Sequence, residues 1–414
     1  MSDRPVVLVV AAADTEAEAY RGYCLHSVAA AYDVVLITSR EPSWEVPCLR
    51  DCVVVPDPTD QAALSAAGRT LAARWNLAGV FTWTEWYLVP VARLARRLGL
   101  PTTPPNVMQA CRNKATARAV FAHHGVPSAA SVPVRTREEA HAAAERIGYP
   151  VVLKPAAHAA SIGVLRADTP DQLATAYQVT ARAAGQGRES TSVLVEEYLD
   201  GPEVSVECVT HRGETTVAAV TRKTVSPPPH FEELAHSVDA ADPLLPAVTP
   251  AARAAIRALG ITDGISHVEM RLVQGTPRLI EVNGRLAGDM IGHLVALATG
   301  IDLPRAAADI ACDRTPALAP AKASAAAIHL IYPPTSGTLT HLRLGGPRPP
   351  WLERVHVQHR TGDRLLLCED GGDMFTARIG YLITTAPTAE TANTRAETAL
   401  QHLDFRIEPD TATP

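Results

Sequence analysis

Four short apolar runs in the first hundred residues constrain the fold more than any other feature of the sequence. The runs are VVLVV (6–10), VVLIT (34–38), CVVV (52–55) and AGVFT (78–82). Strands that are apolar on both faces are typical of parallel sheets buried between helices. Helix-like stretches separate them at about 15–31, 60–75 and 86–98. This alternation predicts an open parallel α/β sheet, which ends at the proline-rich segment PTTPP (101–105).

The region from 106 to 312 differs, because several strand-like runs follow one another without a helix between them. We expect helices at 107–124, 137–147, 170–185 and 248–259. We expect strands at 150–154, 193–198, 203–210, 216–221, 265–273 and 278–282. Consecutive strands indicate antiparallel pairing, so this region is predicted to be α+β. Residues 224–246, which contain three consecutive prolines, are expected to form a long irregular segment that is functional or mobile.

A third unit spans residues 313–414 and is predicted to be rich in strands. Its strand-like runs are 326–332, 354–360, 363–369 and 377–386, and a helix is expected at 388–402. The final residues, PDTATP (409–414), are expected to be disordered.

Composition narrows the class of protein. A chain of 414 residues has room for roughly two to three domains. The formal charge of −6 gives no reason to expect nucleic acid or an anionic membrane as partner. The N-terminal apolar run is too short for a signal peptide, and no later run approaches the ~20 residues that cross a bilayer. Seven scattered cysteines, with only Cys48 and Cys52 close together, indicate reduced thiols and a cytoplasmic location.

Two lysines in the central region are candidates for binding phosphate. Lys114 opens a predicted helix, and Lys154 ends a predicted strand in GYPVVLKP. The loop AAHAASIGV (156–164) follows Lys154, and its small side chains would let backbone N–H groups approach a phosphate. It does not match the G-x-x-x-x-G-K pattern, and a solvated surface position is the common alternative for any lysine.

The segment VLVEEYLDGPEVSVECV (193–209) contains a strand end, a turn at Asp200-Gly201-Pro202 and a new strand that begins at Glu203. A connection of this kind exposes backbone groups that can bind an adenine edge, and Glu203 can bind ribose hydroxyls. From this segment alone, a plain hairpin with charged rims is the simpler interpretation.

The strongest signal is HVEMRLVQGTPRLIEVNGRLAGDM (267–290), with a Gly-Thr-Pro turn at 275–277. Glu269 and Glu281 fall on neighbouring strands, and Asn283 shares a strand face with Glu281. Two carboxylates and an amide oxygen form a set suited to Mg²⁺ shared with phosphates, and Arg285 can neutralise a transferring phosphoryl group. A solvated hairpin is the alternative. The apolar flanking residues favour a buried sheet, in which uncompensated carboxylates are costly.

Glu233 and His236 form an E-x-x-H pair in the proline-rich segment. A zinc pair is disfavoured by the surrounding prolines and by the absence of other ligands nearby in the sequence. The simplest alternative is an exposed loop histidine.

Taken together, these residues resemble the ATP-grasp superfamily over essentially the whole chain. EEYLDGPEVSV (196–206) resembles the nucleotide hinge of D-alanine–D-alanine ligases, and the interval from Glu269 to Glu281 resembles biotin carboxylase. PPPHFEELAHSVDA (227–240) followed by VNGRLAGDMIGHLVALATGIDL (282–303) is most similar to the L-amino-acid ligases, which form dipeptides. The resemblance implies an N-terminal parallel-sheet domain (1–105), an ATP-grasp domain (106–312) with a mobile lid at about 120–195, and a C-terminal β-rich subdomain (313–414).

The resemblance also implies roles for individual residues. ATP phosphates would meet Lys114 and Lys154, with the loop through Ser161 and Gly163 closing over them. The adenosine would be bound by Glu196, Glu197, Tyr198, Leu199 and Glu203. Mg²⁺, with Mn²⁺ as a substitute, would be bound by Glu269, Glu281 and Asn283. Catalysis would involve Arg285, His236 and Glu233. The loop departs from the family's glycine-rich pattern at Ala159 and Ala160. Asp289 stands where relatives have a glycine or a bulky residue, so the size and charge of the substrate stay open.

The implied reaction is ATP-dependent amide formation through an acyl phosphate, from a small carboxylate and an amine such as amino acids. Relatives are often dimers, so a homodimer stays open. The rival interpretations are another ATP-grasp enzyme, such as a bicarbonate-using carboxylase or a nucleotide-pathway ligase, and a catalytically silent ATP-binding protein. The sequence does not identify the acyl donor, the amine or the pathway.

Overall fold

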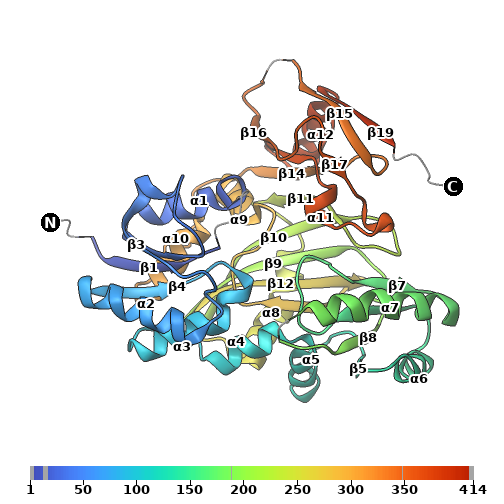
Figure 1. Ribbon diagram of the computed structural model, residues 1–414, viewed down its shortest axis with the longest axis horizontal. Helices are drawn as coiled ribbons and strands as arrows, with labels where there is room; N and C mark the ends of the chain where they lie inside the picture. The colour runs from blue at the N-terminus through green and yellow to red at the C-terminus, as the bar shows by residue number, and fades with distance from the viewer. Residues whose placement is uncertain (1–3, 13–16, 188, 347, 410–414) are drawn as a thin grey trace.

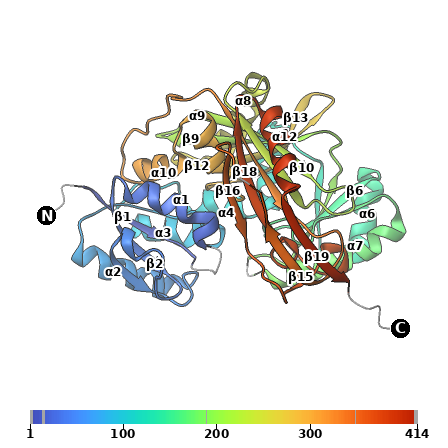
Figure 2. The same ribbon diagram turned by 90° about the horizontal axis from the view of Figure 1, so that it is seen from above.

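The computed structural model describes residues 4–12, 17–187, 189–346 and 348–409. The N-terminal sheet and the unit formed by residues 131–197 lie on opposite sides of a large central sheet, and a small sheet formed by residues from 337 to 409 lies above it in the view of Figure 1 (Figures 1 and 2). No helix in the described ranges is long and apolar enough to cross a membrane. Of the predicted disordered tail 409–414, residues 410–414 lie outside the described residues.

The N-terminal sheet is parallel, as predicted, with the order β3-β2-β1-β4. Its strands are β1 (Val6–Val10), β2 (Asp33–Thr38), β3 (Leu49–Val54) and β4 (Leu77–Phe81). The associated helices are α1 (Ala17–Ala29), α2 (Gln61–Arg74) and α3 (Leu88–Arg97), with short 3-10 turns η1 (Val46–Cys48) and η2 (Glu85–Tyr87). Side chains from both faces of β1 and β2 are buried, which explains why these runs carry no polar alternation.

The single helix predicted at 107–124 is wrong, because two helices occupy this stretch. They are α4 (Pro105–Arg112) and α5 (Lys114–His123). Asn113 between them is extended, and its side chain accepts hydrogen bonds from the backbone N–H groups of Ala115 and Thr116. Asparagine is a favoured N-cap for this reason, and the cap places Lys114 at the first position of α5.

A four-stranded antiparallel sheet with the order β5-β8-β6-β7 forms the lid unit, residues 131–197. Its elements are β5 (Ser131–Val134), α6 (Arg137–Ile147), β6 (Val151–Pro155), β7 (Leu165–Ala167), α7 (Pro170–Gln186) and β8 (Val193–Glu197). The lid unit has its own apolar cluster, which includes Leu153, Leu173 and Val195. Strands β5 and β7 are too short to have been recognised from periodicity.

The central sheet has eight antiparallel strands in the order β13-β12-β9-β10-β11-β14-β18-β16. They are β9 (Glu203–His211), β10 (Glu214–Val225), β11 (Glu233–Asp239), β12 (Gly264–Val273), β13 (Thr276–Asn283), β14 (Ala325–Ile331), β16 (Leu352–Val357) and β18 (Gly380–Ala386). Helices α8 (Leu245–Leu259), α9 (Ile291–Thr299), α10 (Leu303–Ala311) and α12 (Ala389–Leu400) pack on it. The sheet continues across residue 312, and the division into three domains stays a prediction.

Residues 224–246 are not one irregular segment, as the prolines had suggested. β10 extends to Val225, β11 begins at Glu233, and α8 begins at Leu245. Glu233 and His236 therefore lie on a strand of the central sheet, between β10 and β14, and not on a loop. Pairing with both neighbours compensates for the weak local strand signal, because tertiary context overrides propensity in sheets.

The remaining elements form a small sheet with the order β17-β15-β19, made of β15 (Gly337–Leu344), β17 (Arg364–Leu365) and β19 (Leu403–Pro409). The sequence did not predict β15 or β19. The strand expected at 363–369 is reduced to two residues, followed by the 3-10 turn η3 (Cys368–Asp370) and the short helix α11 (Met374–Ala377).

Candidate active site

One cavity of about 1430 Å³ lies between the central sheet, the lid unit, α1 and the C-terminal residues around 358–378. A single small ligand usually occupies roughly 300–1,000 Å³, so this cavity has room for more than one. All of the site residues predicted from the sequence line it. They are Lys114, Lys154, Ser161, Gly163, Glu196, Glu197, Tyr198, Leu199, Glu203, Glu233, His236, Glu269, Glu281, Asn283 and Arg285.

The two facing carboxylates are set by the β12–β13 hairpin. Its turn is formed by Gln274 and Gly275, both with positive φ, so the predicted Gly-Thr-Pro turn is displaced by one residue. Such two-residue turns match the twist of antiparallel strands and fix their register. A β-bulge between Glu269 and Met270 shifts the register by one residue, so that Glu269 lies opposite Glu281 and not opposite Ile280. Asn283 Nδ2 donates to Glu281 Oε1 at 2.7 Å.

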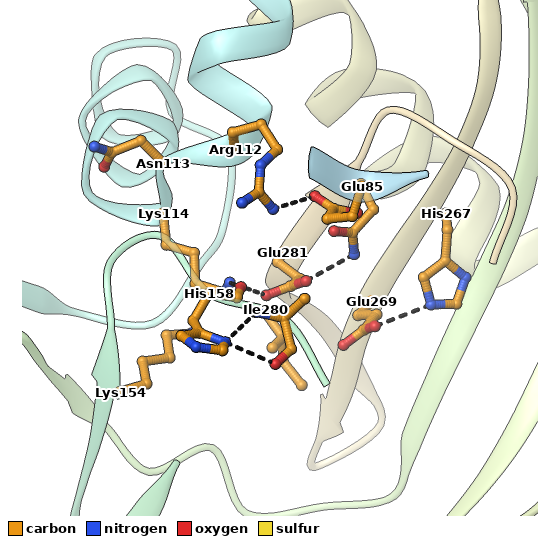
Figure 3. A network of polar contacts seen from close by, with 12 residues as sticks. Glu85, Arg112, Asn113, Lys114, Lys154, His158, His267, Glu269, Ile280 and Glu281 are labelled. Atoms are coloured by element: carbon orange, nitrogen blue, oxygen red, sulfur yellow. Dashed lines mark hydrogen bonds and ion pairs between the residues drawn. The ribbon is translucent and has the colours of Figure 1, made fainter. Parts of the chain in front are cut away.

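Like charges opposite each other in a sheet are destabilising, and cations compensate them here. Lys114 Nζ lies 3.0 Å from Glu281 Oε2, and His267 Nε2 lies 2.9 Å from Glu269 Oε1. Figure 3 shows Lys114 and Lys154 on one side of Glu281, and Glu269 with His267 on the other. Burial lowers the pKa of His267, but the Glu207 carboxylate outweighs burial and raises it to about 10.

The oxygen donors of Glu269, Glu281 and Asn283 fit a Mg²⁺ ion that shares its remaining ligands with phosphates and water. Within the described ranges, no three His, Cys, Asp or Glu side chains form a preassembled metal cluster. Mg²⁺ usually binds proteins through one or two carboxylates and completes its shell with substrate oxygens and water.

Lys154 is buried, with 5% of its surface exposed, and contacts Glu196 at 2.6 Å. Arg118 forms a bidentate pair with the same carboxylate at 2.8 and 3.0 Å. Burial raises the pKa of Glu196, but the Arg118 and Lys154 cations outweigh it and lower the pKa to about 2. Arg118 also lines the cavity, and the sequence analysis missed it because an arginine inside a helix carries no local signal.

The residues predicted to bind the adenosine, from Glu196 to Leu199, already contact other residues of the protein. Glu197 pairs with Arg278 at 2.6 Å, and the backbone oxygen of Leu199 accepts from Arg271 at 3.2 Å. The Tyr198 ring stacks beside Phe231 with centroids 6.4 Å apart. With both glutamates in internal ion pairs, contact between this segment and a nucleotide would depend on the backbone and on Tyr198.

The loop after Lys154 adopts left-handed backbone conformations at Ala160, Ser161 and Gly163. A Cβ atom on Gly163 would lie 2.5 Å from the Cβ of Ala183, so this glycine is required by a close approach of α7. Ala160 and Ser161 adopt the same region at a cost of roughly 1–2 kcal/mol each for a residue with a side chain.

Lys223 lies at the centre of three carboxylates and was missed by sequence reasoning. Its Nζ is 2.8 Å from Glu203, 2.7 Å from Glu233 and 3.6 Å from Glu269. Burial lowers the pKa of Lys223, but these carboxylates outweigh it and hold the pKa above its ordinary value. Lys223 thus connects Glu203, which is predicted to bind ribose, with Glu233 on β11 and Glu269 on β12.

Arg285 pairs with Glu85, a buried carboxylate from η2 that also binds Arg112. Burial raises the pKa of Glu85, but Arg285 and Arg112 outweigh it and lower the pKa to about 2. Glu85 was not predicted, although a lone acid in the apolar stretch FTWTEWYLV (81–89) was a usable signal.

His236 is buried, and its Nε2 lies 3.4 Å from Asp289 Oδ2 and 3.7 Å from Glu233 Oε2. Asp289 in turn pairs with Arg378, which approaches from the segment before β18 at 2.7 Å. Glu233 Oε2 and His236 Nδ1 are buried and have no hydrogen-bond partner among the described residues. Burial raises the pKa of Glu233, more than the Lys223 and His236 charges lower it.

Three family models match the chain. The ATP-grasp N-terminal domain matches residues 28–102, the ATP-grasp domain matches 147–293, and the L-amino acid ligase C-terminal domain 2 matches 329–408. The uncharacterized protein y4rH of Sinorhizobium fredii is 30% identical over 358 residues, which cover 85% of this chain and 73% of that protein. The chain belongs to the ATP-grasp family.

Other members of the family align over less of their length. This ATP-grasp chain is 28% identical over 262 residues to human carnosine synthase 1, covering 59% of the chain and 32% of that protein. It is 26% identical over 263 residues to alanine–anticapsin ligase of Bacillus subtilis, covering 58% of the chain and 55% of that protein. The chain thus spans between about a third and just over half the length of these two relatives.

Solved structures confirm the ATP-grasp fold. The L-amino acid ligase from Bacillus licheniformis superposes with a TM-score of 0.78 at 23% identity, covering 98% of this chain and all of that one. The biotin carboxylase domain of the Hydrogenobacter thermophilus 2-oxoglutarate carboxylase has a TM-score of 0.72 at 18% identity, covering 97% and 90%. That domain was determined in complex with MgADP, ADP and bicarbonate.

Proposed function

We propose that this ATP-grasp chain is a carboxylate–amine ligase that forms an amide, of peptide type, through an acyl phosphate and releases ADP and phosphate. The observation that carries the proposal is the Lys223 cluster. Lys223 contacts both Glu269 on β12 and Glu233 on β11, beside His236. Groups suited to phosphoryl transfer and groups suited to receiving an amine therefore share one charged network in one cavity.

In the first step, a substrate carboxylate attacks the γ-phosphoryl group of ATP. Lys114 and Lys154 line the cavity beside Glu281 and Glu196 and would balance the phosphate charge. Glu269, Glu281 and Asn283 would hold Mg²⁺, or Mn²⁺ in its place, which when bound supplies charge neutralisation at the phosphates. Arg285 would stabilise the phosphorylated intermediate.

In the second step, the amine nitrogen bonds to the acyl carbon, and the bond from that carbon to the phosphate oxygen breaks. Phosphate leaves with the bonding electrons, and the amine loses a proton. Glu233 is suited to take that proton because its Oε2 has no partner among the described residues and burial raises its pKa. His236 is positioned by Asp289 beside it and would donate to the developing oxyanion.

The test is ADP and phosphate release measured over a matrix of paired amino acids, followed by the mass of the product. The proposal expects an amide whose amount matches the ADP released. ADP release that requires bicarbonate and no amine would indicate a carboxylase instead. Nucleotide binding without ADP release for any pair would indicate a catalytically silent protein.

A further inference from the structure

Arg21 is a cation of the cavity that the proposed mechanism does not use. It lies on α1, lines the cavity and is partly buried. Its Nη1 donates to the backbone oxygen of Ala287 at 2.8 Å, in the segment between β13 and α9. A guanidinium has five N–H donors, so this bond and a contact with the Cys24 thiol leave part of its capacity available.

The other buried and partly buried cations of the cavity each have a carboxylate within 4 Å. These are Lys114, Arg118, Lys154, Lys223, Arg271, Arg285 and Arg378. Arg21 has no such carboxylate among the described residues, and the one remaining arginine of the lining, Arg182, is exposed. Removing a cation from water without a counter-charge is costly, so the arrangement at Arg21 is incomplete.

Nearby acidic groups do not complete it. Asp289 is already bound by Arg378 at 2.7 Å and faces His236 at 3.4 Å. Burial raises the pKa of both Tyr23 and Cys24, the groups next to Arg21 on α1, which keeps them neutral. This end of the cavity therefore carries the guanidinium groups of Arg21 and Arg378 beside Asp289, whose carboxylate is already paired with Arg378.

We propose that Arg21 binds a non-reacting carboxylate of a substrate, so that the enzyme favours substrate pairs with a second carboxylate beside the one that is activated. This inference rests on the proposed ligase function. Charge-assisted bonds between arginine and carboxylate are strong and bidentate, and the uncommitted donors of Arg21 fit such a partner. The second carboxylate belongs either to the amine substrate or to a dicarboxylic acyl donor.

The first arm of the test compares amine substrates. Each L-amino acid that serves as the amine is compared with its carboxamide, which lacks the charge but keeps the shape. We expect kcat/KM to favour the carboxylate form by about 10- to 100-fold, as charged hydrogen bonds commonly do. Arg21→Gln should reduce this preference to near one, mainly by raising KM, and Arg21→Lys should keep part of it.

The second arm compares acyl donors, with hydroxylamine in place of the amine. L-aspartate is compared with L-asparagine, and L-glutamate with L-glutamine, by hydroxamate formation. If the second carboxylate belongs to the donor, the preference and its loss in Arg21→Gln occur in this arm instead. Arg253→Gln is the matched control, because Arg253 also donates to a backbone oxygen, of Thr215 at 3.0 Å, but lies outside the cavity.

The inference is overturned if the wild type shows no preference in either arm, or if Arg21→Gln keeps the wild-type preference in both. If Arg21→Gln does not fold, the test uses Arg21→Lys instead. A wild-type carboxylate preference and a wild-type KM in Arg21→Lys would contradict the role proposed for Arg21. Wild-type hydroxamate or amide formation supports the ligase function whatever happens at Arg21. Absence of any ATP-dependent product from the wild type removes both proposals.

Discussion

The two ends of the cavity differ in how completely their charges are compensated. At the phosphate end, Lys114 pairs with Glu281 and Lys154 pairs with Glu196. At the opposite end, Glu233 Oε2 and His236 Nδ1 have no hydrogen-bond partner among the described residues. Buried groups are normally hydrogen-bonded, and these two residues line the cavity, where a ligand could supply the missing partner.

This difference indicates that the two ends of the cavity are preorganised to different extents before substrates bind. The phosphate end is assembled in advance, with lysines held in place by carboxylates that ATP and Mg²⁺ would share. The acyl and amine end is incomplete, so its substrates would supply the missing partners. Substitutions at the first end should affect phosphoryl transfer as a whole, whereas those at the second should affect how ADP release is coupled to amide formation.

The largest effect is expected from Glu281→Gln. The amide keeps the shape and one oxygen but removes the charge opposite Glu269 and the partner of Lys114. Turnover should fall by about 10²- to 10³-fold, while ATP affinity changes far less. ADP release and calorimetric titration with ATP measure the two quantities. Glu214→Gln, on an exposed position of β10, is the control, and near-normal turnover of Glu281→Gln at saturating Mg²⁺ contradicts the metal assignment.

Glu233→Gln and His236→Ala test the incomplete end. Both variants should bind ATP and Mg²⁺ normally but produce about 10- to 100-fold less amide per ADP, a loss typical of removing general acid–base assistance. The acyl phosphate should pass to hydroxylamine or water instead. Hydroxamate trapping with product quantification measures this ratio. A wild-type ratio and rate in both variants would exclude the pair from the chemistry and would remove the contrast between the two ends.

Lys154→Ala tests the preassembled end without breaking the fold. Glu196 keeps its bidentate partner Arg118, so the buried carboxylate is not left uncompensated. We expect the KM for ATP to rise by about 10-fold through loss of one phosphate counter-charge, while the protein still unfolds in one cooperative transition at a lower temperature. Calorimetry and thermal unfolding are the measurements. Unchanged ATP affinity and turnover would exclude Lys154 from the site.

The smallest effect concerns acid stability. Glu85 and Glu196 each have a pKa of about 2 in the folded protein, below the ordinary value of 4.5. Because the folded state binds fewer protons, their stabilisation is present above about pH 5 and is lost as the pH falls toward 2. Urea unfolding between these values should show a loss on the order of 1–3 kcal/mol per group. Glu196→Gln should flatten that dependence, and an unchanged slope would contradict the compensation proposed for the phosphate end.

The sequence predicted those parts of the site whose spacing is local. Glu281 and Asn283 lie two positions apart on one strand, so period-two alternation was enough to predict their shared face. The bulge that brings Glu281 opposite Glu269 could not be predicted from alternation. The parallel N-terminal strands were also predicted from a local signal, because each strand is a short run of apolar residues. The E-x-x-H motif was noticed, but its setting was wrong, because β11 owes its strand conformation to β10 and β14 and not to its own residues.

By itself, the sequence determined the parallel N-terminal unit, the two lysines, the acidic hairpin and hence the family. Only the tertiary structure decided which charges meet: Arg118 with Glu196, Glu85 with Arg285, Lys223 with three carboxylates, and Arg21 with no carboxylate among the described residues. These partners lie on different elements far apart in the chain. The cost of a buried charge depends on its neighbours in space, and local periodicity holds no information about them.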